Sequence, residues 1–183
     1  MNEKIKALRE KMKSLNLEGM IISNPINIKY LTEITSEGTL LITRRENIFI
    51  TNTMYIEEVN STLTIGDEII VTDATYLSDD DYENFFTFCE NVGFEEKYIT
   101  YECYKKSMQK YKANNLVETE GIIEKQRMIK DEEEIRKIKK ASEITDQCFA
   151  HLLQYIKIGM TEKEVLEEII RFFNQSEADR NSI

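Results

Sequence analysis

The sequence is poor in several features, and each shortage narrows the choice of fold and function. There is one proline in 183 residues, so no proline-rich linker marks a domain boundary. No apolar run approaches the ~20 residues that a membrane-spanning helix requires. The N-terminal segment MNEKIKALREKMKSLNLEG is charged and lacks the apolar stretch of a secretory signal. We therefore expect neither membrane insertion nor secretion.

Basic residues are also in the minority. The chain has 24 lysines and arginines against 34 acidic residues, a net charge of -10, which argues against a nucleic-acid partner. Hydrophobic residues make up 41%, enough for a folded core. The cysteines are odd in number and form no CxxC pair: Cys89, Cys103 and Cys148. We expect them to be reduced thiols in a cytoplasmic protein.

Histidine is scarcest of the metal-binding residues. His151, the one histidine, follows Cys148 by three residues, and two such ligands without a second pair make a weak zinc site. The preferred interpretation is a helix-surface histidine beside a small buried thiol. The acidic run Asp79–Asp81 is similarly interpreted as the first turn of a helix capped by Ser78, rather than as a metal site.

The first 120 residues alternate between helical and extended patterns. Ile5, Leu8, Met12 and Leu15 recur at helical spacing, and Asn24 followed by Pro25 predicts an N-cap and a helix start. This alternation predicts an α/β domain of about five or six strands over residues 1–120. The expected helices are 3–16, 25–31, 53–62, 78–93 and 104–114, and the expected strands are 20–23, 36–43, 48–51, 67–73 and 97–102, with a hairpin at 36–51.

After residue 120 the alternation of helical and extended patterns ends. Residues 121–130 are interpreted as a linker, and 131–183 as two helices, one begun by Asp131 and ended at Gly159, the other capped by Thr161 with Glu164. The first carries the apolar stripe Ile135, Ile138, Ala141, Thr145, Phe149, Leu152 and Ile156, and the second carries Val165, Ile169, Ile170 and Phe173. Because two helices cannot bury both stripes, we expect them to dimerise, swap, or pack back on the first domain.

Two groups of segments resemble a known family. ISNPINIKYLT, SEGTLLIT and IFITNTMY resemble the N-terminal domain of the creatinase, prolidase and Xaa-Pro aminopeptidase family. RMIKDEEEIRKIKKASEITDQCF and IKIGMTEKEV resemble the linker and first two helices of its pita-bread catalytic domain. The resemblance spans nearly the whole chain. It implies an α/β domain with a mixed sheet flanked by helices, then the first helices of an incomplete pita-bread domain.

The resemblance also implies a chemistry. Peptidases of the family bind two divalent metals, usually manganese or cobalt, through two aspartates, one histidine and two glutamates, and the cations activate a shared water. Those ligands lie downstream of the GMTE helix, so no catalytic or metal residue is carried over. We expect a fragment without activity of its own, from a cytoplasmic homodimer that cleaves proline-containing peptides. This part would restrict substrate access and build the dimer.

Two alternatives keep the fold and change the function. Non-catalytic relatives of the pita-bread fold exist, so the chain is also compatible with a binding or regulatory module. A creatinase-like amidinohydrolase is the other alternative, because the segments present here do not discriminate between the substrates.

The sequence departs from the family pattern at two places. Where many members have YLTGFTGSEG, this chain has YLTEITSEG, with Glu33 replacing a glycine and Ile34 an aromatic. Where many have TDGRY, this chain has TNTMY: Asn52 and Met54 replace the aspartate and arginine, and Tyr55 is kept. In several members this region reaches the neighbouring subunit's active site, so Asn52, Met54 and Tyr55 are candidate substrate-lip residues. Met54 cannot pair a carboxylate; alternatively, the arginine is purely structural.

Overall fold

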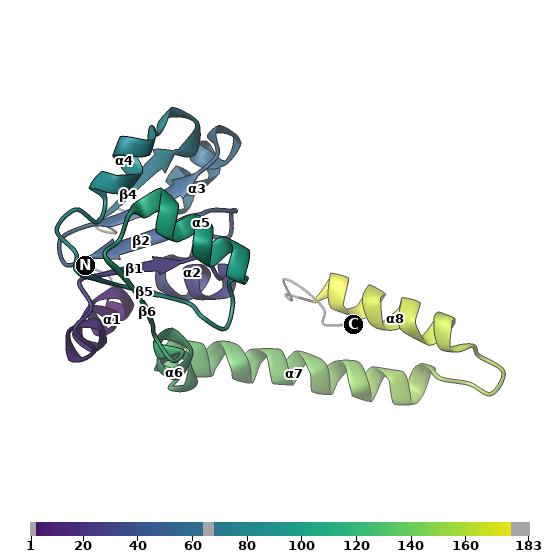
Figure 1. Ribbon diagram of the computed structural model, residues 1–183. Coiled ribbons are helices and arrows are strands. Elements are labelled where there is room, and N and C mark those ends of the chain that lie inside the picture. Colours follow the sequence, from purple (N-terminus) through teal and green to yellow (C-terminus); the bar gives the residue numbers. More distant parts are fainter. Residues whose placement is uncertain (1–2, 64–67, 177–183) are drawn as a thin grey trace. The chain divides into compact units, whose positions relative to one another are not determined.

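The computed structural model of the chain describes residues 3–63 and 68–176 (Figure 1). The chain divides into two compact units, with the boundary between Met128 and Ile129. The boundary lies inside the range 121–130 that was expected as a linker. Most of that range forms α6 (Ile122–Met128), which belongs to the first unit.

The first unit is built on a six-stranded sheet with the order β4-β3-β2-β1-β5-β6. β2 runs antiparallel to β1 and β3, and the other neighbouring pairs are parallel. The predicted mixed α/β sheet and its central hairpin are therefore confirmed. The strands are β1 (Gly19–Ile22), β2 (Thr39–Thr43), β3 (Asn47–Thr51), β4 (Ile69–Asp73), β5 (Asn91–Phe94) and β6 (Asn115–Glu118).

Helices cover both faces of the sheet because each strand alternates its side chains between two apolar cores. On one face, Met20 and Ile22 of β1 pack with residues of α1, α2, α3 and α6. On the other face, Ile21 packs with residues of α4 and α5 and of the segments that follow these helices. The helices not yet given are α1 (Glu3–Ser14), α2 (Pro25–Thr32), α3 (Ile56–Thr62), α4 (Asp79–Asn84) and α5 (Tyr101–Tyr111), with short 3-10 turns η1 (Thr53–Tyr55) and η2 (Ala74–Tyr76).

Two predicted helix starts in this unit are confirmed by their caps. The Asn24 side chain accepts from the backbone N–H of Ile26, and Pro25 occupies the first turn of α2. Ser78 caps α4 in a capping box with Asp81. The pKa of Asp81 is lowered, first by the Ser78 hydroxyl and then by the Ser78 N–H. Capping accounts for the acidic run.

Two expected elements are corrected, and two strands of the sheet were not expected. The helix over 78–93 ends at Asn84, and its last residues instead form β5. The strand expected at 97–102 is absent from the described structure: Thr100 there caps α5, accepting from Cys103 N–H. β6 at Asn115–Glu118 was not expected. Asp67, the first residue of the strand expected at 67–73, lies outside the described residues.

The second unit is a helical hairpin of α7 (Glu132–Tyr155) and α8 (Glu162–Gln175). Both predicted caps are confirmed, Asp131 with Glu134 and Thr161 with Glu164. α7 ends at Tyr155, four residues before Gly159, whose φ is +97°. Residues 177–183 lie outside the described part of the chain.

The buried face of α7 differs from the predicted one. Ile144 and Cys148 are buried, with His151, Leu152 and Tyr155 half-buried beside them. Of the predicted stripe, Ile135, Ile138, Phe149 and Ile156 are exposed. Helix α8 therefore covers a face of α7 next to the predicted stripe. On that face, Glu168 of α8 is the polar partner of His151.

Candidate functional site

The carboxyl ends of five strands meet at one edge of the sheet, which we call the carboxyl edge. β1, β3, β4, β5 and β6 share one direction, since β2 alone runs against its neighbours. In open α/β sheets, ligands bind preferentially outside the carboxyl ends of strands. This edge is therefore where a functional site is first to be sought.

The candidate lip residues lie at this edge, directly after β3. Asn52 and Met54 are exposed, Met54 by 76%. Tyr55 is half-buried and packs against the core. The region thus presents the apolar side chain of Met54 outward at the carboxyl edge. The Tyr55 side chain anchors the region to the core.

Hydrogen bonds fix this lip to the neighbouring strand. The Thr53 hydroxyl donates to Asp73 Oδ2 over 2.6 Å, and the backbone N–H of Thr75 donates to Asp73 Oδ1 over 2.8 Å. These bonds lower the pKa of Asp73, with the Thr53 hydroxyl the larger cause. Asp73 therefore acts as a charged brace between η1 and η2.

A buried polar network occupies the other end of the carboxyl edge. Asn27 is fully buried, and its Nδ2 donates to Glu95 Oε1 over 2.7 Å and to Glu124 Oε1 over 2.6 Å. Its Oδ1 accepts from Arg127 Nη1 over 3.0 Å. The other Glu95 oxygen accepts the backbone N–H groups of Ser23 and Asn24. The network joins α2, α6 and the ends of β1 and β5.

Burial raises the pKa of Glu95, and the nearby charge of Glu124 adds to this, whereas its hydrogen bonds oppose the shift. With its oxygens occupied by donors of this chain, Glu95 is better placed to hold α6 than to bind a ligand. We assign the network a structural role.

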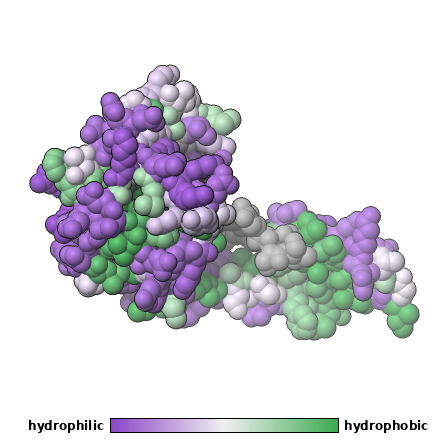
Figure 2. Space-filling model, viewed as in Figure 1, coloured by the Kyte–Doolittle hydropathy of each residue, from purple (hydrophilic) through white to green (hydrophobic). Residues whose placement is uncertain are grey.

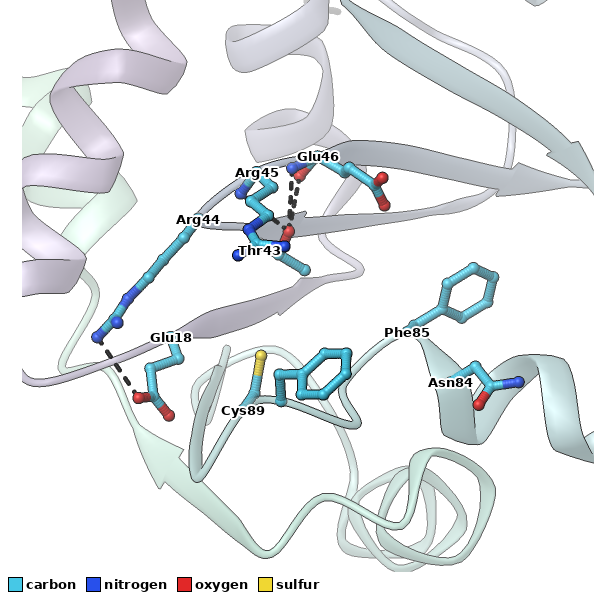
Figure 3. Close-up of a pocket in the computed structure, with 9 residues that line it drawn as sticks. Glu18, Thr43, Arg44, Arg45, Glu46, Asn84, Phe85 and Cys89 are labelled. Carbon is cyan, nitrogen blue, oxygen red and sulfur yellow. Dashed lines mark hydrogen bonds and ion pairs between the residues drawn. The ribbon is translucent and has the colours of Figure 1, made fainter.

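A cleft of about 490 Å³ lies at the opposite edge of the sheet, beside the turn between β2 and β3 (Figure 3). Thr43, Arg44, Arg45 and Glu46 form one wall. Glu18 and four residues in and after α4 complete it: Asn84, Phe85, Phe88 and Cys89. We call it the amino-edge cleft.

Metal-binding groups do not gather in the part of the chain that the structure describes. No group of three or more His, Cys, Asp or Glu side chains there could hold a metal ion. Cys148 is buried, and His151 Nε2 lies 2.6 Å from Glu168 Oε1. Arg171 Nε donates to the other oxygen of Glu168. These residues do not fit a dinuclear metal centre, and no catalytic step is derived from them.

Sequence reasoning missed both the buried network and the cleft. Asn27 and Glu95 are 68 positions apart, and nothing in the local sequence signals their contact. Arg44 and Arg45 fall within the predicted hairpin at 36–51, in the short connection between its two strands. The one available signal was the pair of arginines in a two-strand connection, which does not specify a cleft.

Comparison with known proteins decides the family. Residues 4–129 match the Creatinase/Prolidase N-terminal domain. The chain belongs to this family. An uncharacterized peptidase of Bacillus subtilis, YqhT, is 31% identical over 98% of this chain and 51% of its own length. The chain spans about half the length of the curated relatives it matches.

Solved structures of the family share the fold. A Xaa-Pro dipeptidase from Bacillus anthracis is 30% identical, with a TM-score of 0.82 over 94% of this chain and 48% of its own. The N-terminal domain of the cytoplasmic peptidase PepQ from Mycobacterium tuberculosis matches 68% of this chain at a TM-score of 0.60 and 21% identity. The chain thus comprises the family's mixed-sheet domain and the first helices of an incomplete pita-bread domain. None of the helices described here has the length and apolar character needed to cross a membrane.

Proposed function

We propose that the chain is the N-terminal, substrate-access and dimerisation part of a metal-dependent Xaa-Pro peptidase of the aminopeptidase P or prolidase type. The observation that carries this is the 30% identity with the Xaa-Pro dipeptidase from Bacillus anthracis along 94% of the chain. The family match over residues 4–129 supports it. The proposed substrates are proline-containing peptides, and the proposed location is the cytoplasm, as for the similar PepQ.

The proposal gives the lip residues a role. Met54, exposed at the carboxyl edge, would contact apolar parts of a substrate or of a second subunit. An arginine there would instead pair with a carboxylate. Asn52 retains hydrogen-bonding capacity without the charge of an aspartate.

The metal ions belong to the parent protein in this proposal. Two divalent cations, manganese or cobalt, would be held by residues beyond those described and would supply an activated water. The chain of 183 residues alone is then inactive.

The test compares the 183-residue chain with the product of its coding frame extended past Ile183. Both are assayed, with added Mn²⁺, for release of proline from Ala-Pro and for release of the N-terminal amino acid from Xaa-Pro-Xaa peptides. We expect turnover by the extended protein and none above a no-protein control by the short chain. Turnover by the short chain would refute its assigned role.

A second candidate is a non-catalytic binding or regulatory module of the same fold. The replacement of the family's aspartate and arginine by Asn52 and Met54 favours it. An extended frame that lacks two aspartates, a histidine and two glutamates in family order, or a stop codon after Ile183, would select this candidate over the peptidase.

A further inference from the structure

The amino-edge cleft has a rigid wall. The Thr43 hydroxyl accepts the backbone N–H groups of Arg45 and Glu46 over 3.3 and 3.0 Å, and Thr43 N–H donates to Glu46 O over 2.9 Å. From α1, Arg9 Nε donates to Thr43 O over 2.9 Å, and its Nη2 reaches Asn47 Oδ1 over 3.0 Å. Two arginines are therefore presented on a turn whose backbone is already fixed.

The two guanidinium groups differ in their partners. Arg44 extends toward Glu18 and pairs with its Oε1 at 3.4 Å (Figure 3). The other Glu18 oxygen accepts the backbone N–H groups of Glu90 and Asn91, which lower the pKa of Glu18, with a smaller contribution from Arg44. Across residues 3–63 and 68–176, no ion pair or side-chain hydrogen bond engages the Arg45 guanidinium. A cation with unused donors thus lines the cleft.

The facing wall is apolar. Phe85 is half-buried, whereas Phe88 is 93% exposed. The Cys89 thiol beside them is buried, and burial, followed by the charge of Glu18, raises its pKa. The Cys89 thiol therefore stays protonated and forms part of the cleft wall, and it does not act as a nucleophile. Pockets of roughly 300–1,000 Å³ that combine aromatic walls with a few placed polar groups are typical of small-molecule sites.

We propose that the amino-edge cleft binds an organic carboxylate that carries an aromatic or branched apolar group, with Arg45 pairing the carboxylate and Phe85 and Phe88 contacting the apolar part. Both a free acid and the carboxyl terminus of a peptide present this chemistry. Glu46 lines the same cleft, and its negative charge would repel a bound carboxylate. The site lies at the opposite edge of the sheet from the lip residues and is independent of the peptidase proposal.

The test is titration of the isotope-labelled 183-residue chain by two-dimensional NMR. The probe is N-acetyl-phenylalanine, and its neutral amide, N-acetyl-phenylalaninamide, is the matched control. We expect saturable shifts of the Arg45 and Cys89 amide signals with the acid only. Parallel titrations with 3-phenylpropionate and with acetyl-Ala-Ala-Phe distinguish a free acid from a peptide terminus by which binds more tightly.

Variants assign the roles within the site. Arg45→Gln and Phe88→Ala should each weaken binding of the acid by about three- to tenfold, as expected for a partly exposed charge-assisted bond or ring contact. Glu46→Gln should tighten it, and Arg136→Gln, the same change on α7, should leave it unchanged. Circular dichroism checks that each variant is folded. Absence of saturable shifts, equal binding of acid and amide, or unchanged affinity in folded Arg45→Gln would overturn the proposal.

Discussion

Glu33 stands where many family members have glycine, and its backbone shows why glycine suits the position. It follows α2 as the C-cap with φ +62° and ψ -1°, in the left-handed region, and its N–H donates to Lys29 O. Residues with a Cβ are disfavoured there, whereas glycine is not. The departure noted in the sequence therefore places a strained residue at the end of a helix whose start carries the Glu95 network.

Glu33→Gly is expected to stabilise the protein by about 0.5–1 kcal/mol, because glycine relieves the left-handed strain more than its extra unfolded-state entropy costs. Urea unfolding followed by circular dichroism measures this. The matched control is Glu57→Gly in the first turn of α3, which should destabilise. Equal destabilisation by both changes would show that Glu33 is not strained.

Glu168 is a second residue whose environment decides its behaviour. It is 5% exposed, accepts from Arg171 Nε over 2.8 Å, and lies 2.6 Å from His151 Nε2. Hydrogen bonds from Arg171 first, and from His151 second, lower its pKa from 4.5 to about 2. The His151 ring stacks with Tyr155 and Phe172. The expected surface histidine is thus half-buried and joined to the other helix.

The lowered pKa predicts a pH dependence. A depressed carboxyl pKa contributes stability that is full above the unfolded value near 4.5 and is lost as pH falls toward about 2. Glu168→Gln should therefore destabilise the α7–α8 hairpin at pH 7, and its difference from the parent chain should shrink between pH 4.5 and 2. Amide exchange of residues 144–175, referenced at each pH to unstructured peptides, measures this. Glu167→Gln, on the same helix but exposed, should show no such trend.

At the scale of elements, Asn27 connects parts of the first unit that are remote in sequence. One amide satisfies two carboxylates, one after β5 and one on α6, and accepts from Arg127 of α6. Glu95 also accepts the backbone N–H groups of Ser23 and Asn24, directly before α2. These main-chain hydrogen bonds fix the position of the Glu95 carboxylate. The network therefore fixes α6, the last helix before the chain passes into the second unit.

Asn27→Ala should cost about 2–4 kcal/mol, because it leaves buried charged groups short of hydrogen-bond donors. The free energy of unfolding in urea gives the value. Asn60→Ala, on the exposed side of α3, should change it by less than about 0.5 kcal/mol. A loss for Asn27→Ala no larger than for the control would mean that water or rearranged side chains replace the amide.

The elements show how far sequence reasoning reaches. Caps and apolar periodicity are local signals, and they correctly located α1, α2, the β2–β3 hairpin and the starts of α4, α7 and α8. β5 was missed because its four residues, NVGF, include a glycine and follow a helix-like acidic and aromatic run. Residues 97–102 contain strand-favouring Tyr, Ile and Thr, but Thr100 caps a helix there. Strand identity was decided by pairing, which is not local.

The candidate sites were less predictable than the fold for the same reason. The lip residues were found through a family pattern around Tyr55, a contiguous stretch. Glu95 with Asn27, and Arg45 with Phe88, come together only through the sheet order and the helix connections.

At the scale of the whole molecule, the main question is what covers the apolar surface of the second unit.

That surface follows one face of α7. Ile135, Ile138, Phe149, Leu153 and Ile156 recur at helical spacing, and all are exposed. Figure 2 shows hydrophobic residues gathered over much of the visible face of the hairpin. Monomeric proteins rarely leave a continuous apolar patch of this kind in water. In the proposed parent peptidase, the remainder of the pita-bread domain would cover it.

Without that remainder, the 183-residue chain should self-associate through α7. Sedimentation velocity over a wide range of protein concentration should show mass increasing with concentration. Phe149→Glu should shift the chain toward the monomer, because a charge in an apolar interface is costly to bury. Gln147→Glu, an exposed position on another face of α7, is the matched control.

If instead the stripe packs back on the first unit, Phe149→Glu would leave the mass unchanged and increase amide exchange in α7. A monomer at all concentrations whose α7 and α8 amides already exchange freely would contradict both outcomes, because helices that open freely are protected neither by a second copy nor by the first unit.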